Sequence, residues 1–195
     1  TLFPYTTLFR SEWREMPPFY MARAEEPNPL VQQWEQKFRD RLRIIYTTGS
    51  PFSALTIAKV LREGSLVGMQ IDRVLGDSAV TVQMCGRPVR FPIGPALLSR
   101  VTEAPLIPSF FAIDDSGDKP KLVHHVGPAI FVEKTRDRDA DLRRAVEQLV
   151  TVYEAIVRRY PTQWYQFFDF FDQPEAVVAL DAAPPRPLAP SATER

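Results

Sequence analysis

The chain has 195 residues with 24 basic and 24 acidic side chains, so its net charge at neutral pH is zero. This length suits one domain with a sizeable core, and the balanced charge excludes a basic field that would attract nucleic acid. The single cysteine, Cys85, excludes an internal disulfide framework and is typical of a reducing cytoplasm. All apolar runs are shorter than the ~20 residues of a spanning helix, so a membrane contact would be peripheral or lie outside this sequence.

The two ends of the chain differ in composition from the part between them. Residues 1–16 nearly repeat TLF-x-YTTLF, lack an initiator Met and lack the basic residues that open a signal peptide. We interpret them as a non-native leader joined to a truncated reading frame. Residues 173–195 are rich in Ala and Pro, which predicts a disordered tail. One domain is therefore expected over residues 17–172.

The first half of this domain alternates apolar runs with amphipathic stretches. The apolar runs predict strands over residues 19–22, 43–47 and 66–71. One helix is expected to open with Asn28 and Pro29, an N-cap and first-turn pair. A second is expected to begin at Ser50 and to end at Gly64. This alternation predicts an α/β fold with a mixed, mainly parallel sheet flanked by helices.

The second half is expected to begin with a strand over residues 80–84. The stretch 91–96, rich in Pro and Gly, predicts a turn into a helix that ends before Pro105. Apolar segments over 122–126 and 129–132 predict either a pair of strands or one strand bent around Gly127 and Pro128. The charged segment 136–141 is expected to be exposed. A long helix follows and ends at Pro161. Its inward face is expected to hold Leu142, Ala145, Val146, Leu149, Val152, Tyr153 and Ile156.

Two oppositely charged residues, Asp72 and Arg73, directly follow the strand expected over 66–71. Open α/β sheets present their sites at the carboxyl ends of strands, so these two residues are the first site candidates. The alternative is a turn ion pair, which contributes little when it is exposed. Arg90 is a second anion candidate, because it precedes a helix N-terminus with free N–H groups. Gly94 belongs to the same candidate site, although it is expected chiefly to shape the turn.

Several motifs in a fixed order resemble one family. They are Asp72-Arg73, Gly86-Arg87-Pro88, Gly94-Pro95-Ala96-Leu97-Leu98, Ala104-Pro105-Leu106-Ile107-Pro108 and Pro161-x-Gln163-Trp164. With them, residues 17–168 resemble the bacterial lysophospholipid and lipid A acyltransferases. The resemblance implies a glycerolipid acyltransferase-like fold at the cytoplasmic face of the inner membrane. It implies transfer of an acyl group from acyl carrier protein or acyl-CoA to a hydroxyl of a lysophospholipid or an acylated glucosamine lipid, without metal or cofactor.

The same resemblance implies roles for the strand-end pair. Related enzymes bind the acceptor's phosphate in this block, near an acidic residue. Arg73 would contact the phosphate with two donors, and Asp72 would orient the phosphate or a hydroxyl. Asp72 is therefore the catalytic candidate, with Arg73, Arg90 and Gly94 as substrate-binding candidates.

The family's catalytic motif is a His followed, after four residues, by Asp or Glu. The two histidines, His124 and His125, have Ala129 and Ile130 at that spacing. In relatives the motif precedes the strand equivalent to residues 19–22, so it is expected upstream of the authentic part of this sequence. The sheet is therefore expected to be incomplete at the N-terminus. This chain is not expected to catalyse acyl transfer. A non-catalytic lipid-binding or scaffold protein of the same fold is the main alternative. A nucleotide-binding domain is disfavoured, because no Gly-rich loop follows a strand.

Two further sets of residues have a structural interpretation beside a functional one. Adjacent strand residues point to opposite faces, so His124 and His125 are expected to be structural rather than to share a metal. The segment QWYQFFDFF, residues 163–171, is dense in aromatic rings. These rings either pack the last helix onto the sheet or place some of Tyr165, Phe168 and Phe171 at a membrane interface.

Overall fold

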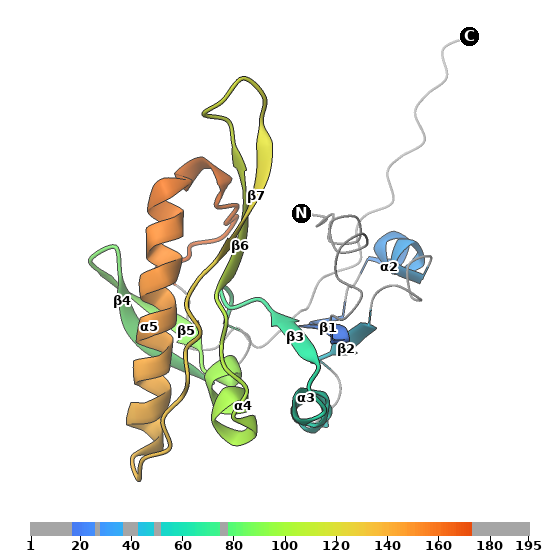
Figure 1. Ribbon diagram of the computed structural model, residues 1–195, viewed down its shortest axis with the longest axis vertical. Coiled ribbons are helices and arrows are strands. Elements are labelled where there is room, and N and C mark those ends of the chain that lie inside the picture. Colours follow the sequence, from blue (N-terminus) through green and yellow to red (C-terminus); the bar gives the residue numbers. More distant parts are fainter. Residues whose placement is uncertain (1–16, 26–27, 37–42, 49–51, 75–77, 173–195) are drawn as a thin grey trace.

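The computed structural model describes residues 17–25, 28–36, 43–48, 52–74 and 78–172 (Figure 1). The elements in chain order are β1 (Phe19–Arg23), α2 (Pro29–Gln36), β2 (Arg43–Tyr46), α3 (Ser53–Arg62), β3 (Leu66–Met69), β4 (Ala79–Met84), β5 (Arg87–Pro92), α4 (Gly94–Thr102), β6 (Ser109–Asp114), β7 (Lys121–Val126), α5 (Arg138–Arg159) and η1 (Pro161–Gln163). The leader predicted over 1–16 and the tail predicted over 173–195 lie outside the described residues.

Three strands form a parallel sheet in the order β2–β1–β3. β1 pairs with both neighbours, so that Ala22 lies opposite Ile45 of β2 and Met69 of β3. α3 runs between β2 and β3 along the chain and packs its buried face against Ala22 and Ile45. Parallel neighbours require such a crossover, so the predicted mixed α/β fold is confirmed. The parallel strands form a small sheet of their own, and the antiparallel strands form separate hairpins, β4–β5 and β6–β7, rather than joining it in one mixed sheet.

The signals that begin and end the first helices act as the sequence predicts. The side chain of Asn28 accepts a hydrogen bond of 2.9 Å from the backbone N–H of Leu30, which caps α2. After α3, Gly64 adopts a φ of 80°, a left-handed conformation in which glycine is favoured. The helix predicted from Ser50 begins at Ser53, and Ser50 lies outside the described residues.

The turn predicted over 91–96 is wrong in its first residues, because β5 continues to Pro92. β4 and β5 form an antiparallel hairpin whose two-residue turn is Cys85 and Gly86, at φ of 53° and 76°. Proline has no N–H for the ladder, so Pro88 and Pro92 hid this strand from a pattern-based prediction. The backbone N–H of Cys85 donates to the Glu154 carboxylate at 2.8 Å, which fastens the turn to α5.

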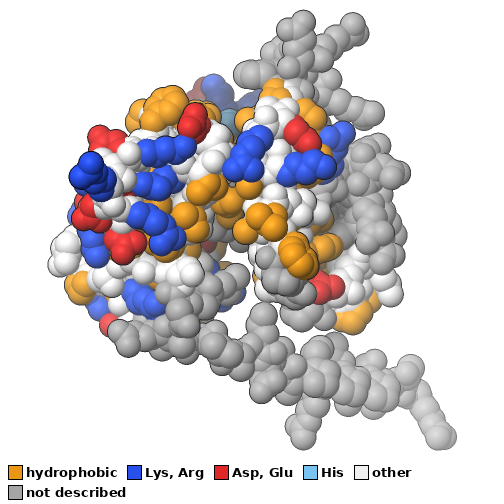
Figure 2. Space-filling view, turned by 90° about the horizontal axis from the view of Figure 1, so that it is seen from below, with side chains coloured by type: hydrophobic (Ala, Val, Ile, Leu, Met, Phe, Trp, Pro, Cys, Tyr) orange, Lys and Arg blue, Asp and Glu red, His pale blue; other side chains and the backbone are white. Residues whose placement is uncertain are grey.

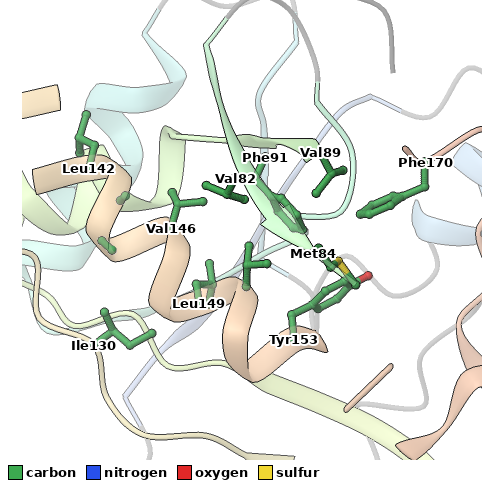
Figure 3. Close-up of a cluster of buried hydrophobic side chains, with 13 residues drawn as sticks. Val82, Met84, Val89, Phe91, Ile130, Leu142, Val146, Leu149, Tyr153 and Phe170 are labelled. Atoms are coloured by element: carbon green, nitrogen blue, oxygen red, sulfur yellow. The ribbon is translucent and has the colours of Figure 1, made fainter. Parts of the chain in front are cut away.

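α5 packs against β4 and β5, and their buried side chains form the main core (Figure 3). The buried members include Val82, Met84, Val89, Phe91, Ile130, Leu142, Ala145, Val146, Leu149, Val150, Tyr153 and Phe170. The predicted inward face of the long helix is confirmed for five of its seven residues, whereas Val152 and Ile156 are half-buried. Val150 is buried although its position was not predicted, because the helix is covered on more than one stripe.

The hairpin of β6 and β7 stands beside the C-terminal half of α5 (Figure 1). The strand predicted over 122–126 is confirmed as β7. The strand predicted over 129–132 is wrong: only Ile130 pairs, through an isolated bridge to Leu106. That bridge buries Ile130 in the main core.

The segment expected to be exposed, 136–141, contains the most buried carboxylate among the described residues. The side chain of Asp141 is fully covered, and it accepts hydrogen bonds from Arg100, Arg144 and both the backbone and the hydroxyl of Thr135. Burial on its own raises the pKa of Asp141, but the hydrogen bonds from Thr135 and Arg100 hold it below its ordinary value. The predicted exposure is confirmed for residues 136–139 and is wrong for Asp141, because its partners Arg100 and Thr135 lie on α4 and in the loop before α5.

Exposed charges of both signs surround this buried one. Arg144 pairs with Glu133 at 3.0 Å, and Lys134 pairs with Glu103 at 2.6 Å. Figure 2 shows basic and acidic side chains interspersed on one face of the molecule rather than gathered by sign. Exposed pairs of this kind contribute little to stability individually.

Candidate functional site

Asp72 and Arg73 lie just beyond the carboxyl end of β3, in the short segment that leads toward β4. β3 ends at Met69, two residues earlier than the predicted strand. The side chain of Asp72 is half-buried and that of Arg73 is exposed. Of the two, Arg73 is therefore the one that a ligand can approach without a rearrangement.

The contacts of this pair come from the end of the domain rather than from neighbouring sequence. The side-chain amide of Gln166 donates a hydrogen bond of 2.6 Å to Oδ2 of Asp72. The guanidinium of Arg73 lies over the ring of Phe168, 4.9 Å from its centroid. Within the described residues, Asp72 and Arg73 turn to these two partners rather than pairing with each other, unlike the predicted turn ion pair.

Both partners belong to residues 163–171, which we call the aromatic strap. The Gln163 amide exchanges two hydrogen bonds of 2.7 Å with the backbone N–H and C=O of Ile113. Trp164 donates its indole N–H to the hydroxyl of Tyr153 at 2.7 Å. Phe170 is 4% exposed and meets Trp164 edge to face, with centroids 4.9 Å apart. These contacts fix the strap on both sides of Gln166 and Phe168.

Tyr153 connects the strap to the strand-end pair. Burial raises the pKa of its phenol well above the ordinary value, and the charge of Asp72 raises it further. Hydrogen bonds with Trp164 and Gln166 act on the pKa in the opposite direction. The phenol therefore remains protonated at physiological pH, and its hydroxyl accepts the hydrogen bond from Trp164 that holds the strap on α5.

The other two predicted site residues lie on different elements. Arg90 is half-buried on β5, opposite Thr81. Gly94 is the first residue of α4, and a Cβ added there would meet nothing within 4 Å. Its φ is not left-handed, so the turn does not use the conformational freedom of glycine at this position. The structure joins Asp72 and Arg73 through the strap, whereas Arg90 lies within the β4–β5 hairpin and Gly94 begins the helix that follows it.

The two histidines have separate partners on the β6–β7 hairpin. Nε2 of His124 lies 2.6 Å from the Ser109 hydroxyl, and its ring stacks on Phe111 with centroids 4.1 Å apart. Burial, together with the neighbouring His125, lowers the pKa of His124. Nε2 of His125 lies 3.1 Å from the Tyr160 hydroxyl. In the part of the chain that the structure describes, no cluster of His, Cys, Asp and Glu is placed to hold a metal ion.

Sequence reasoning selected Asp72 and Arg73 by their position but missed Gln166. A single glutamine between aromatic residues carries no distinctive pattern, and 94 positions separate it from Asp72. Phe168 was singled out as a ring for the core or the membrane, and its position under a guanidinium was not predicted. Only the folded arrangement brings the two segments together.

Comparison with known proteins identifies the family of the chain. Residues 14–173 match the family described as bacterial lipid A biosynthesis acyltransferase, a stretch that runs from before β1 to just beyond the strap. No curated protein matches the chain. Among the described residues, no helix combines the length and the apolar character needed to cross a membrane. The chain belongs to the bacterial lipid A biosynthesis acyltransferase family, and this membership implies acyl transfer to a lipid A precursor.

Proposed function

We propose that the strand-end pair binds the acceptor in this acyl transfer. Arg73 holds a phosphate of the lipid A precursor, and Asp72 orients the acceptor hydroxyl toward the thioester of acyl carrier protein or acyl-CoA. The observation that carries this proposal is the exposed guanidinium of Arg73, supported on one face by the Phe168 ring. A stacked guanidinium keeps its edge donors available, and this edge matches two phosphate oxygens.

Acyl transfer joins the acceptor oxygen to the thioester carbonyl carbon, breaks the C–S bond and requires a base for the hydroxyl proton. The family's His-x4-carboxylate motif is not formed by the two histidines of this chain. Both histidines lie on the β6–β7 hairpin with partners of their own. We therefore assign acceptor binding to Asp72 and Arg73, with Arg90 and Gly94 as a second anion-binding candidate. The experiments below accordingly measure binding of the acceptor instead of turnover.

Arg73→Ala is expected to weaken binding of glucosamine 1-phosphate by at least ~10-fold, because a charge-assisted contact contributes ~1.5–3 kcal/mol. Titration calorimetry measures the dissociation constant, with glucosamine as the ligand that lacks the phosphate. Asp72→Asn is expected to weaken binding less, and to lower turnover in an enzyme that contains the complete catalytic motif.

Arg87→Ala is the matched control, because Arg87 is also stacked on a strap ring, that of Phe171, at 4.5 Å. Its affinity for the sugar phosphate should equal that of the wild type. If Arg73→Ala binds the sugar phosphate as tightly as the wild type, the proposed role of the strand-end pair is wrong. A chain that binds the acceptor but whose gene lacks the catalytic motif would instead support the lipid-binding alternative.

We also propose that the strap faces the cytoplasmic surface of the inner membrane. Of the rings expected there, Phe168 and Phe171 are half-buried beneath Arg73 and Arg87. The rings free to meet lipid are Tyr165, 57% exposed, and Phe167, 92% exposed. Membrane contact therefore depends chiefly on Phe167.

Phe167→Ser is expected to weaken binding to vesicles of phosphatidylethanolamine and phosphatidylglycerol by about tenfold, because it removes one buriable aromatic ring. Vesicle cosedimentation measures the bound fraction. The control is Phe131→Ser, which removes a ring that is 69% exposed outside the strap. Equal losses in the two variants would contradict a membrane face at the strap.

A further inference from the structure

We infer that Gln166 and Phe168 are positioning residues for the acceptor site, holding Asp72 and Arg73 in the orientation that binds the phosphorylated acceptor. The inference rests on the proposed function of the strand-end pair. It adds that the site is assembled from two distant segments, so that affinity for the acceptor depends on the aromatic strap as well as on β3.

The first step concerns the orientation of the Asp72 carboxylate. The 2.6 Å hydrogen bond from Gln166 engages Oδ2, so an acceptor hydroxyl would bind at Oδ1. The backbone N–H of Gln166 donates to the carbonyl of Trp164 at 3.1 Å, and the Trp164 indole donates to the Tyr153 hydroxyl at 2.7 Å. These bonds hold the backbone of Gln166 in place, and its side-chain amide fixes the direction in which the carboxylate faces. A charge-assisted hydrogen bond of this length is among the stronger contacts available to a carboxylate.

The second step concerns the plane of the Arg73 guanidinium. An arginine side chain at the surface samples many rotamers, and ordering it on binding reduces affinity. The Phe168 ring lies 4.9 Å from the guanidinium carbon, within the range of a cation–π contact. That ring in turn contacts Phe170, with centroids 6.2 Å apart, and Phe170 is buried in the main core. The core therefore supports the guanidinium through two rings.

The strap contains a second stacked arginine, which shows what the first one has in addition. Arg87 lies over Phe171 at 4.5 Å, and it also pairs with Asp172 at 3.6 Å. It is the first residue of β5, directly after the β4–β5 turn. Arg87 is partly neutralised by this pair, whereas Arg73 has a hydrogen-bonded carboxylate beside it in sequence. Of these two arginines, Arg73 has no carboxylate partner among the described residues, and it follows a carboxylate whose direction is fixed by Gln166.

The test compares four variants by their affinity for glucosamine 1-phosphate and by their melting temperature. Phe168→Leu removes the ring but keeps a similar apolar volume, and Phe168→Tyr restores a ring. Gln166→Met removes the donor but keeps the shape of the side chain. Phe171→Leu is the matched control, because it removes the same kind of ring from beneath Arg87.

We expect Phe168→Leu and Gln166→Met each to weaken binding by about fivefold. Phe168→Tyr should bind as the wild type does, and so should Phe171→Leu. The melting temperatures of Phe168→Leu and Phe171→Leu should fall by similar amounts, since both lose one half-buried ring. A difference in affinity between two equally destabilised variants separates positioning from packing.

The results that overturn the inference differ from those that overturn the proposed function. Wild-type affinity in both Phe168→Leu and Gln166→Met, with the loss in Arg73→Ala intact, removes the positioning role and leaves the site. Equal losses in Phe168→Leu and Phe171→Leu also remove it, because the effect is then general to the strap. Wild-type affinity in Arg73→Ala removes the proposed site itself.

Discussion

Asp141→Ala is expected to lower the melting temperature of the chain by roughly 10 °C, the largest effect of any single charge removal among the described residues. The carboxylate is buried, and it accepts hydrogen bonds from Arg100, Arg144 and Thr135. Its removal leaves the guanidinium of Arg100, which is 19% exposed, without its buried partner. Thermal unfolding followed by circular dichroism measures the change.

The matched control lies in the same first turn of α5. The side chain of Asp139 is 92% exposed, and it meets Arg138 only at 4.0 Å. Asp139→Ala should therefore change the melting temperature by no more than ~2 °C. Similar losses in the two variants would show that helix-end charge, which both residues provide, accounts for the effect.

The contribution of Asp141 is also expected to depend on pH. Its pKa in the folded chain is lowered, so it contributes stability above the pKa of an unfolded Asp, about 4. That contribution is lost as the pH falls through the lower pKa of the folded state. The difference in melting temperature between the wild type and Asp141→Asn should thus be constant from pH 8 to pH 5 and shrink below pH 4. A difference that stays constant to the lowest pH would contradict this account.

Phe91→Ala is expected to lower the free energy of unfolding by about 3–5 kcal/mol, through lost burial and the cavity left behind. Phe91 is 1% exposed, and its ring meets Tyr153 and Phe170 edge to face at 5.9 and 5.8 Å. These contacts join β5 to α5 and to the strap, so the packing cannot collapse around the cavity without moving three elements. Urea unfolding measures the change.

The control for this substitution is Phe167→Ala, on a ring that is 92% exposed. Removing an exposed ring should change the free energy of unfolding by about 0.5 kcal/mol or less. Comparable losses at the two positions would contradict the placement of the main core.

Much of the fold could be predicted because local patterns report burial. The alternation of strands and helices gave the parallel sheet, and the helical spacing gave the buried positions of α5 such as Leu149. The strand β5 was not predicted, because prolines in a sequence usually indicate a turn. In the structure Pro88 and Pro92 lie opposite Gln83 and Ala79 of β4, in a two-stranded hairpin that tolerates them. The burial of Asp141 was not predicted either. A charged side chain is expected to be exposed, and its partner Arg100 is distant in the sequence.

The residues of the candidate site also differ in whether the sequence could predict them. Asp72 and Arg73 could be selected because position at a strand end is a local property of the sequence. Gln166 could not, because its role depends on a contact that the fold makes across 94 positions. The functions of Asp72, Arg73, Arg90 and Gly94 remain predictions for the binding experiments.

The two hydrogen bonds between Gln163 and Ile113 have a consequence for self-association. A peripheral strand such as β6 offers unsatisfied backbone groups to any passing strand, and this is a common route to aggregation. The side-chain amide of Gln163 carries one donor and one acceptor, and it satisfies Ile113 as the backbone of an adjoining strand would. Gln163 thus occupies the outer edge of β6 at Ile113, where another strand could otherwise pair. We expect the glutamine of the Pro-x-Gln-Trp motif to limit edge-to-edge association at this position, independently of any chemistry at the strand-end pair.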